Sequence, residues 1–171
     1  MACTQTLNGL TRDCEANTGG VKNVYIANYD DVEGLTYTSD VITAIAMATG
    51  KKFKRYHFKR GQANVVQTSQ YNEAGDYAGE SNVLSINFLR QDATKRLEMI
   101  ALSVAELAVI YEDNNGNFFY LGADRPVLRT GGESGSGAAI TDTNRYGLEL
   151  TDQSNALPPT IASDAVAAVI D

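Results

Sequence analysis

Residues 81–90 (SNVLSINFLR) alternate between apolar and polar side chains, and this period of two restricts the fold more than any other feature of the sequence. Leu84, Ile86 and Phe88 share one face of an extended chain, as in a strand that is buried on one side. β-Branched and aromatic residues recur in several other short segments. The sequence therefore predicts a mainly β fold. Further strands are expected at residues 23–28, 35–38, 41–47, 63–71, 107–112, 118–121 and 145–151.

Three turns organise these strands. The Asn-Gly pair at 115–116 lies between two apolar runs, which is the strongest short signal for a hairpin. Gly50 follows 41–47 and precedes the basic segment 51–60, so a second hairpin with a charged outer face is expected there. The polar segment 70–80 has no core face and separates two strand-like runs. It is expected to be the tip of a long projecting hairpin or a mobile loop.

One helix is expected to flank the strands. Asp92 is a candidate N-cap residue before the segment 93–107. Leu97, Ile100, Ala101 and Val104 recur at helical spacing and are predicted to face the core, while Lys95, Arg96 and Glu98 face outward.

Length and charge limit the domain organisation and the partners. A chain of 171 residues suits one compact unit. We divide it into an N-terminal arm (1–22), a β-rich domain (23–160) and a C-terminal tail (161–171) that forms an edge strand or a weak helix. The 21 acidic residues against 14 basic ones give a net charge of −7, which disfavours binding by phosphate neutralisation. Without an apolar membrane segment or signal segment, the chain is expected to be made and first used in a cytoplasm.

Residues for metal or nucleophilic chemistry are few. Cys3 and Cys14 are the only thiols and His57 the only imidazole, so one chain cannot supply four soft zinc ligands. The two cysteines could still bridge each other or bind a metal between subunits, although two small side chains in the N-terminal arm are favoured. His57 lacks an evident nucleophile and orienting acid, and it is expected to be a half-buried strand residue. No enzyme activity, cofactor or metal is expected.

Other motifs have ordinary structural explanations. The Gly-rich run 130–139 lacks the Lys-Ser/Thr of a phosphate loop, and 113–117 has its Gly in the wrong place for a calcium loop. Acidic pairs such as Asp30–Asp31 and Glu112–Asp113 are expected in turns. The basic aromatic segment 51–60 allows nucleic-acid contact, although pairing with acidic neighbours or another subunit is favoured.

A β-rich chain without a catalytic set is expected to act through contacts. Edge strands carry unpaired N–H and C=O groups, which a protein either protects or uses to bind another copy. If the two joined surfaces differ, repetition of the contact generates a ring or a filament.

The succession of four segments resembles the tail tube proteins of tailed bacteriophages, most closely those of phages that infect Bacteroidetes. These segments are 19–32, 41–60, 86–122 and 130–150, and together they cover most of the chain in order. The resemblance implies a β-sandwich or half-barrel flanked by one helix. It also implies a virion protein without enzyme activity, assembled in the bacterial host. It implies rings, commonly hexamers, that stack into a tail tube or neck barrel through which DNA passes without specific binding. Other tail or neck proteins are the implied partners.

Under this hypothesis, edge strands close each ring and residues 62–81 reach the next ring. The expected inter-ring contact residues belong to the polar hairpin tip. Two alternatives remain open from the sequence: a capsid-decorating or carbohydrate-binding β module without tube assembly, and a small hydrolase using His57 or converging carboxylates. The expected contact residues are Tyr71, Asn72, Glu73, Asp76, Tyr77 and Glu80.

Overall fold

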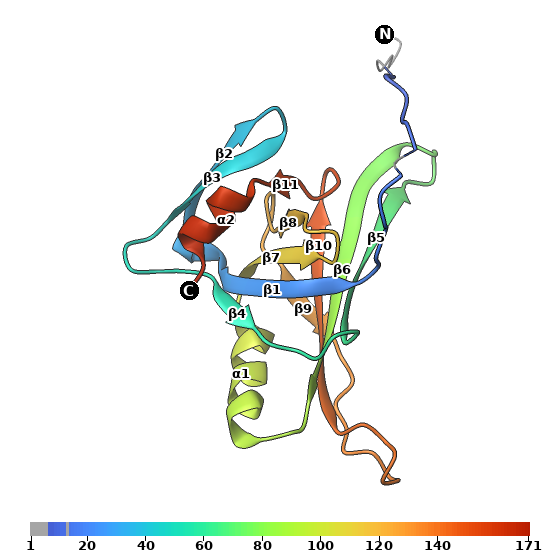
Figure 1. Ribbon diagram of the computed structural model, residues 1–171, viewed down its shortest axis with the longest axis vertical. Coiled ribbons are helices and arrows are strands. Elements are labelled where there is room, and N and C mark those ends of the chain that lie inside the picture. Colours follow the sequence, from blue (N-terminus) through green and yellow to red (C-terminus); the bar gives the residue numbers. More distant parts are fainter. Residues whose placement is uncertain (1–6, 13) are drawn as a thin grey trace.

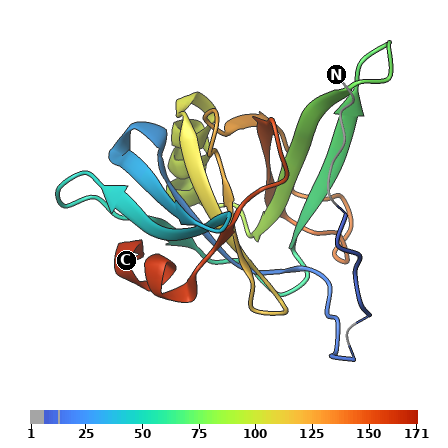
Figure 2. The same ribbon diagram turned by 90° about the horizontal axis from the view of Figure 1, so that it is seen from above.

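The computed structural model describes residues 7–12 and 14–171, whose strands form two facing sheets (Figures 1 and 2). The described part of the chain is mainly β, as the sequence predicts, and it is β-sandwich-like without a closed barrel. In spatial order, the larger sheet contains β2 (Val32–Thr38), β3 (Val41–Met47), β11 (Thr160–Ile161), β8 (Phe118–Leu121), β7 (Leu107–Asp113), β1 (Val21–Asn28) and β4 (Lys54–Tyr56). The smaller sheet contains β5 (Ala63–Tyr71), β6 (Tyr77–Leu89), β10 (Arg145–Ser154) and β9 (Leu128–Gly131).

The first core lies between the two sheets. The alternation predicted for β6 is confirmed, because Leu84, Ile86 and Phe88 are 0%, 1% and 6% exposed. They pack with Leu148 of β10 and Val109 of β7. Complete burial of an aliphatic side chain of this size contributes about 1.5–3 kcal/mol. These contacts hold the smaller sheet against the larger one.

A second core covers the opposite face of the larger sheet. The helix α2 (Ser163–Val169) places Val166 against Phe53 and Tyr120, whose rings meet edge to face with centroids 6.3 Å apart. Both faces of β7 are therefore buried, which explains its continuous apolar run. Residues 161–171 thus contain Ile161, the second residue of β11, and the helix α2, which packs on the core. β11 lies between β3 and β8 inside the larger sheet.

The predicted flanking helix is present as α1 (Ala93–Val104). Asp92 accepts a hydrogen bond from the backbone N–H of Lys95 at 2.8 Å, as expected of an N-cap residue. The side-chain and backbone hydrogen bonds from Lys95 lower the pKa of Asp92. The predicted core face is wrong, however: Met99 and Leu102 are the buried helix residues, whereas Leu97, Ile100, Ala101 and Val104 are exposed.

The expected hairpin between 41–47 and 51–60 is also wrong. β3 pairs with β2, while the three-residue strand β4 pairs antiparallel with β1, with Val24 opposite Tyr56. The basic segment is drawn to β1 because Phe53 anchors it in the second core. His57 lies beyond β4 and is exposed, so it is not a half-buried strand residue.

Candidate functional site

The β5–β6 hairpin extends from the smaller sheet and ends in a short ordered turn (Figure 1). Only residues 72–76 lie between the strands. The Asn72 carboxamide oxygen accepts hydrogen bonds from the backbone N–H groups of Ala74 and Asp76, both at 2.9 Å. Such a local side-chain bond fixes a turn without help from the rest of the fold. The tip is therefore a preformed surface feature.

Two tyrosines flank the tip and lie against each other. The rings of Tyr71 and Tyr77 meet edge to face with centroids 6.1 Å apart, and the side chains remain 65% and 50% exposed. The Tyr77 hydroxyl donates to Glu80 Oε1 at 3.0 Å. Aromatic rings held in this way present a rigid, partly apolar surface. With the exposed carboxylates of Glu73 and Asp76, they form what we call the tip surface.

Glu80, expected among the contact residues, faces the interior and is 4% exposed. Its Oε1 accepts from Ser69 at 2.7 Å as well as from Tyr77. The alternation that points Leu84 inward also points Glu80 and Asn82 inward, so the sequence held the signal for its burial. Glu80 consequently positions Tyr77 and is absent from the exposed tip surface.

A buried polar cluster holds the root of the hairpin. Asn82 donates to Asp152 Oδ2 at 2.9 Å, and the backbone N–H of Gly122 donates to Asp152 Oδ1 at 3.2 Å. Burial raises the pKa of Asp152, and the hydrogen bonds from Asn82 and Gly122 oppose this rise. Gly79 packs so closely that a Cβ atom there would lie 2.6 Å from the Ser154 carbonyl oxygen. The hairpin therefore leaves the sandwich at a fixed angle.

Strand β5 is an open edge of the smaller sheet. It has nine residues, includes no charged residue and no proline, and pairs only with β6 within the described structure. Its residues from Val66 to Tyr71 are all exposed. In an antiparallel pair, alternate residues direct their N–H and C=O groups away from the partner. No strand in the described part of the chain occupies this edge, so it can extend the sheet with another strand.

The other three edges carry features that discourage pairing. β4 is three residues long and includes Lys54 and Arg55. β2 has register shifts at two positions, and β9 has four residues with a shift against β10. Short length, charge and irregular register all protect an edge. Only β5 lacks them over most of its length, since its single shift is at Gln70–Tyr71.

The exposed side of α1 is a second unpartnered surface, far from the tip (Figure 1). We call Leu97, Ile100, Ala101 and Val104 the α1 face. Leu97, Ile100 and Val104 are 64%, 49% and 84% exposed. Helical spacing places all four side chains together, so they form one apolar stripe. Sequence periodicity detects this stripe but assigns it to the core.

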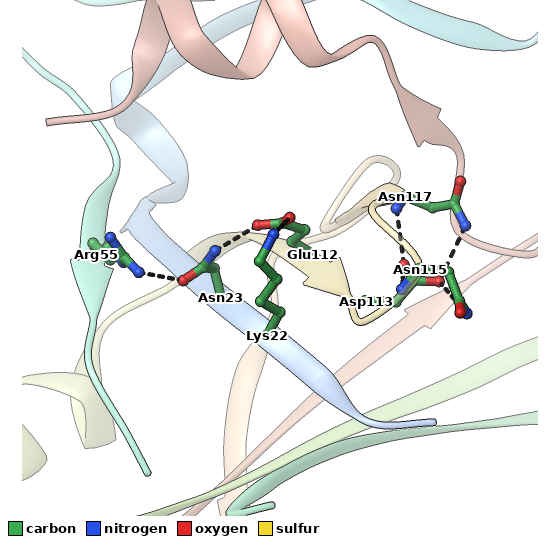
Figure 3. A network of polar contacts seen from close by, with 7 residues as sticks. All are labelled: Lys22, Asn23, Arg55, Glu112, Asp113, Asn115 and Asn117. Carbon is green, nitrogen blue, oxygen red and sulfur yellow. Dashed lines mark hydrogen bonds and ion pairs between the residues drawn. The ribbon is translucent and has the colours of Figure 1, made fainter. Parts of the chain in front are cut away.

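Charged residues on β1, β4 and β7 are already paired. Figure 3 shows Lys22 and Asn23 of β1 donating to the buried Glu112 of β7, each at 2.5 Å, and Arg55 of β4 donating to Asn23. The hydrogen bond to Glu112 and its charge raise the pKa of Lys22. The basic character of β4 thus serves pairing inside the larger sheet.

The turn after β7 also satisfies its own charge. Asp113 Oδ1 accepts from the backbone N–H groups of Asn115 and Asn117 at 2.9 and 2.8 Å (Figure 3). Although burial acts to raise the pKa of Asp113, these hydrogen bonds and those of the Asn side chains lower it overall. The expected hairpin at Asn-Gly is confirmed by the β7–β8 pairing.

Catalytic candidates are scattered in the described residues. His57 and Cys14 are exposed, and Asp31 pairs with Lys51 at 3.4 Å. Within residues 7–12 and 14–171, no group of three or more His, Cys, Asp or Glu side chains is placed to hold a metal ion. Cys3 lies outside the described residues. The described helices include none that is long and apolar enough to cross a membrane.

Comparisons with known proteins found no matching family model, and no curated protein or solved structure significantly similar to this chain.

Proposed function

We propose that this protein is a structural, non-enzymatic subunit that self-assembles into rings, and that the rings stack into a tube. The open edge of β5 carries this proposal. Nine uncharged residues without proline form an edge that other copies can extend. A monomer that remained single in solution would be expected to protect such an edge, as β2, β4 and β9 are protected.

Each proposed ring closes through the β5 edge, which contacts a different surface of the next copy, so the contact is heterologous. Because the same contact repeats around the ring, every copy offers its β5 edge to one neighbour and receives the β5 edge of the other. The resemblance to phage tail tube proteins suggests six copies, with assembly in the bacterial host and incorporation into a virion beside other tail or neck proteins.

Stacking of rings uses the tip surface. The hairpin extends beyond the sandwich, and its turn is fixed by Asn72. Many weak tip contacts around one ring act together through high effective concentration. The net charge of −7 fits a lumen through which DNA, with one charge per ~1.7 Å of axis, passes without adhering.

The proposal is tested by measuring the mass and shape of particles formed by the purified full chain at a series of protein concentrations. Mass photometry and negative-stain electron microscopy are expected to show closed rings, and rods at higher concentration. A chain that remains monomeric at every concentration, or stops at dimers, contradicts the proposal.

A pair of variants tests the β5 edge itself. Val66→Lys places a charge on the exposed edge strand, where Val66 is 53% exposed, and is expected to abolish rings while the monomer stays folded. Gln153→Lys is the matched control, because Gln153 is exposed on the inner strand β10 of the same sheet. Equal ring formation by both variants would exclude β5 as the joining edge.

A deletion tests the hairpin. Removal of residues 71–79 is expected to leave rings but prevent rods. Full-length rods from this variant, seen by electron microscopy, would exclude the hairpin as the stacking element.

A further inference from the structure

We propose that the tip surface of one copy docks on the α1 face of a second copy; this inference rests on the proposed function and names the surface that receives the hairpin. The tip surface offers Tyr71, Tyr77 and two carboxylates. The α1 face offers an apolar stripe with arginines beside it. In the proposed contact, the two tyrosine rings pack on the aliphatic side chains of the helix, and opposite charges set the orientation.

Both surfaces have apolar groups without a partner in the described monomer. Leu97 and Val104 are 64% and 84% exposed although helical spacing aligns them on one side of α1. Tyr71 and Tyr77 keep half or more of their side chains exposed. Tyrosine is enriched among the residues that dominate binding energy at interfaces. Burial of the two tyrosines against the stripe would remove both exposed apolar groups from water.

The charges of the two surfaces are complementary. Residues 61–89 contain no Lys, Arg or His, and the exposed charges of the hairpin tip are Glu73 and Asp76. Near α1, Lys95 pairs with Asp92, and Glu98 accepts a hydrogen bond from the Tyr56 hydroxyl. Arg90 and Arg96 are exposed and form no ion pair with any described residue, so their charges are free to meet an acidic surface. Arg96 lies one helical turn before Ile100, beside the α1 face. Complementary charge fixes the orientation of two docking surfaces.

The fold places these surfaces at opposite ends of one strand. β6 begins at the tip with Tyr77 and ends at Leu89, just before α1. Thirteen extended residues span about 40 Å. Figure 1 shows the β5–β6 turn at the upper right of the sandwich and α1 at the lower left. The tip cannot reach its own helix, whereas the α1 of a second copy placed beyond the tip can receive it, and repetition of this heterologous contact builds a stack.

Charge reversal with rescue tests the contact. Arg96→Glu and Glu73→Lys are each expected to raise the concentration needed for rods by about tenfold, equivalent to about 1.4 kcal/mol, with rings retained. The double variant, which restores opposite charges between neighbouring copies, is expected to recover rods. Arg125→Glu, an exposed arginine elsewhere, is the matched control and is expected to leave rods unchanged.

The outcomes separate the two proposals. Rods that form normally in both single variants overturn the α1 contact while the proposed function stands. Failure of the double variant to recover rods also overturns it, because the two charges then act on different surfaces. Absence of rings and rods from the unmodified protein overturns the proposed function instead.

Discussion

The ring of Tyr71 lies edge-on to the ring of Tyr77 across the hairpin turn, with centroids 6.1 Å apart and an interplanar angle of 73°. The two residues end β5 and begin β6, so they clamp the strands where the tip leaves the sheet. Glu80 holds the Tyr77 hydroxyl from the interior. The tip therefore has its shape before it meets any partner, which lowers the entropy cost of docking.

Tyr71→Ala is expected to separate stacking from folding. Loss of the edge-to-face pair should lower the free energy of unfolding by about 0.5–1.5 kcal/mol, because the ring is largely exposed. Rods should be lost while rings persist. Urea unfolding and electron microscopy measure the two effects. Tyr37→Ala, on β2 and 46% exposed, is the control, and equal loss of rods by the two variants would contradict the assigned role of the tip.

Gly79→Ala is expected to destabilise the protein more than Gly75→Ala. Both glycines have positive φ, +121° and +85°, but only a Cβ atom at Gly79 meets backbone, at 2.6 Å from Ser154. Backbone strain costs about 1–3 kcal/mol, and the clash at Gly79 adds to it. Chemical unfolding of both variants measures the difference. Equal losses in the free energy of unfolding would show that the backbone around Gly79 and Ser154 can move to accommodate a Cβ atom.

Asp152 is expected to make stability fall as pH rises. Its pKa is raised in the folded protein by burial, so the folded state binds more protons than the unfolded state above the ordinary Asp value of about 3.9. Stability should therefore decrease from that pH through the raised folded pKa and then level off. Asp152→Asn removes this titration. Urea unfolding of both proteins over the acidic range should show a steeper decline for the unmodified protein, and parallel curves would contradict the expectation.

Phe53→Ala is expected to cost about 3–5 kcal/mol, as is typical of a buried aromatic residue. Phe53 is 0% exposed and packs against Tyr120 and α2. Phe58→Ala is the comparison in the same basic segment, and it should cost less because Phe58 is only partly buried. Thermal or urea unfolding of the two variants measures which substitution destabilises the protein more. A larger loss for Phe58→Ala would contradict the assignment of Phe53 as the residue that holds this segment in the core.

The sequence was sufficient to predict those features whose geometry is determined by a few neighbouring residues. The alternation around Leu84, the Asn-Gly turn and the Asp92 cap each fix geometry within a few residues, and the structure confirms all three. The hairpin tip was also found from its polar composition. If the alternation around Leu84 had been followed back along the strand, it would have predicted that Glu80 faces the interior and does not belong to the exposed tip.

Non-local packing explains the remaining differences. α1 has apolar residues over much of its circumference, so Met99 and Leu97 are equally good core candidates until the exit of β6 orients the helix. The partner of β4 depends on Phe53 reaching the second core, which residues 161–171 help to build. No single segment of the sequence therefore predicts that β4 pairs with β1. The openness of the β5 edge likewise depends on which strand pairs with β6.

The position of β11 inside the larger sheet has a consequence for biosynthesis. Thr160 and Ile161 bridge β3 and β8, and the Asp171 backbone N–H donates to the Phe53 carbonyl oxygen at 3.1 Å. On the ribosome, the larger sheet stays incomplete until these late residues emerge from the exit tunnel. The larger sheet of a nascent chain therefore matures only after this region has been translated.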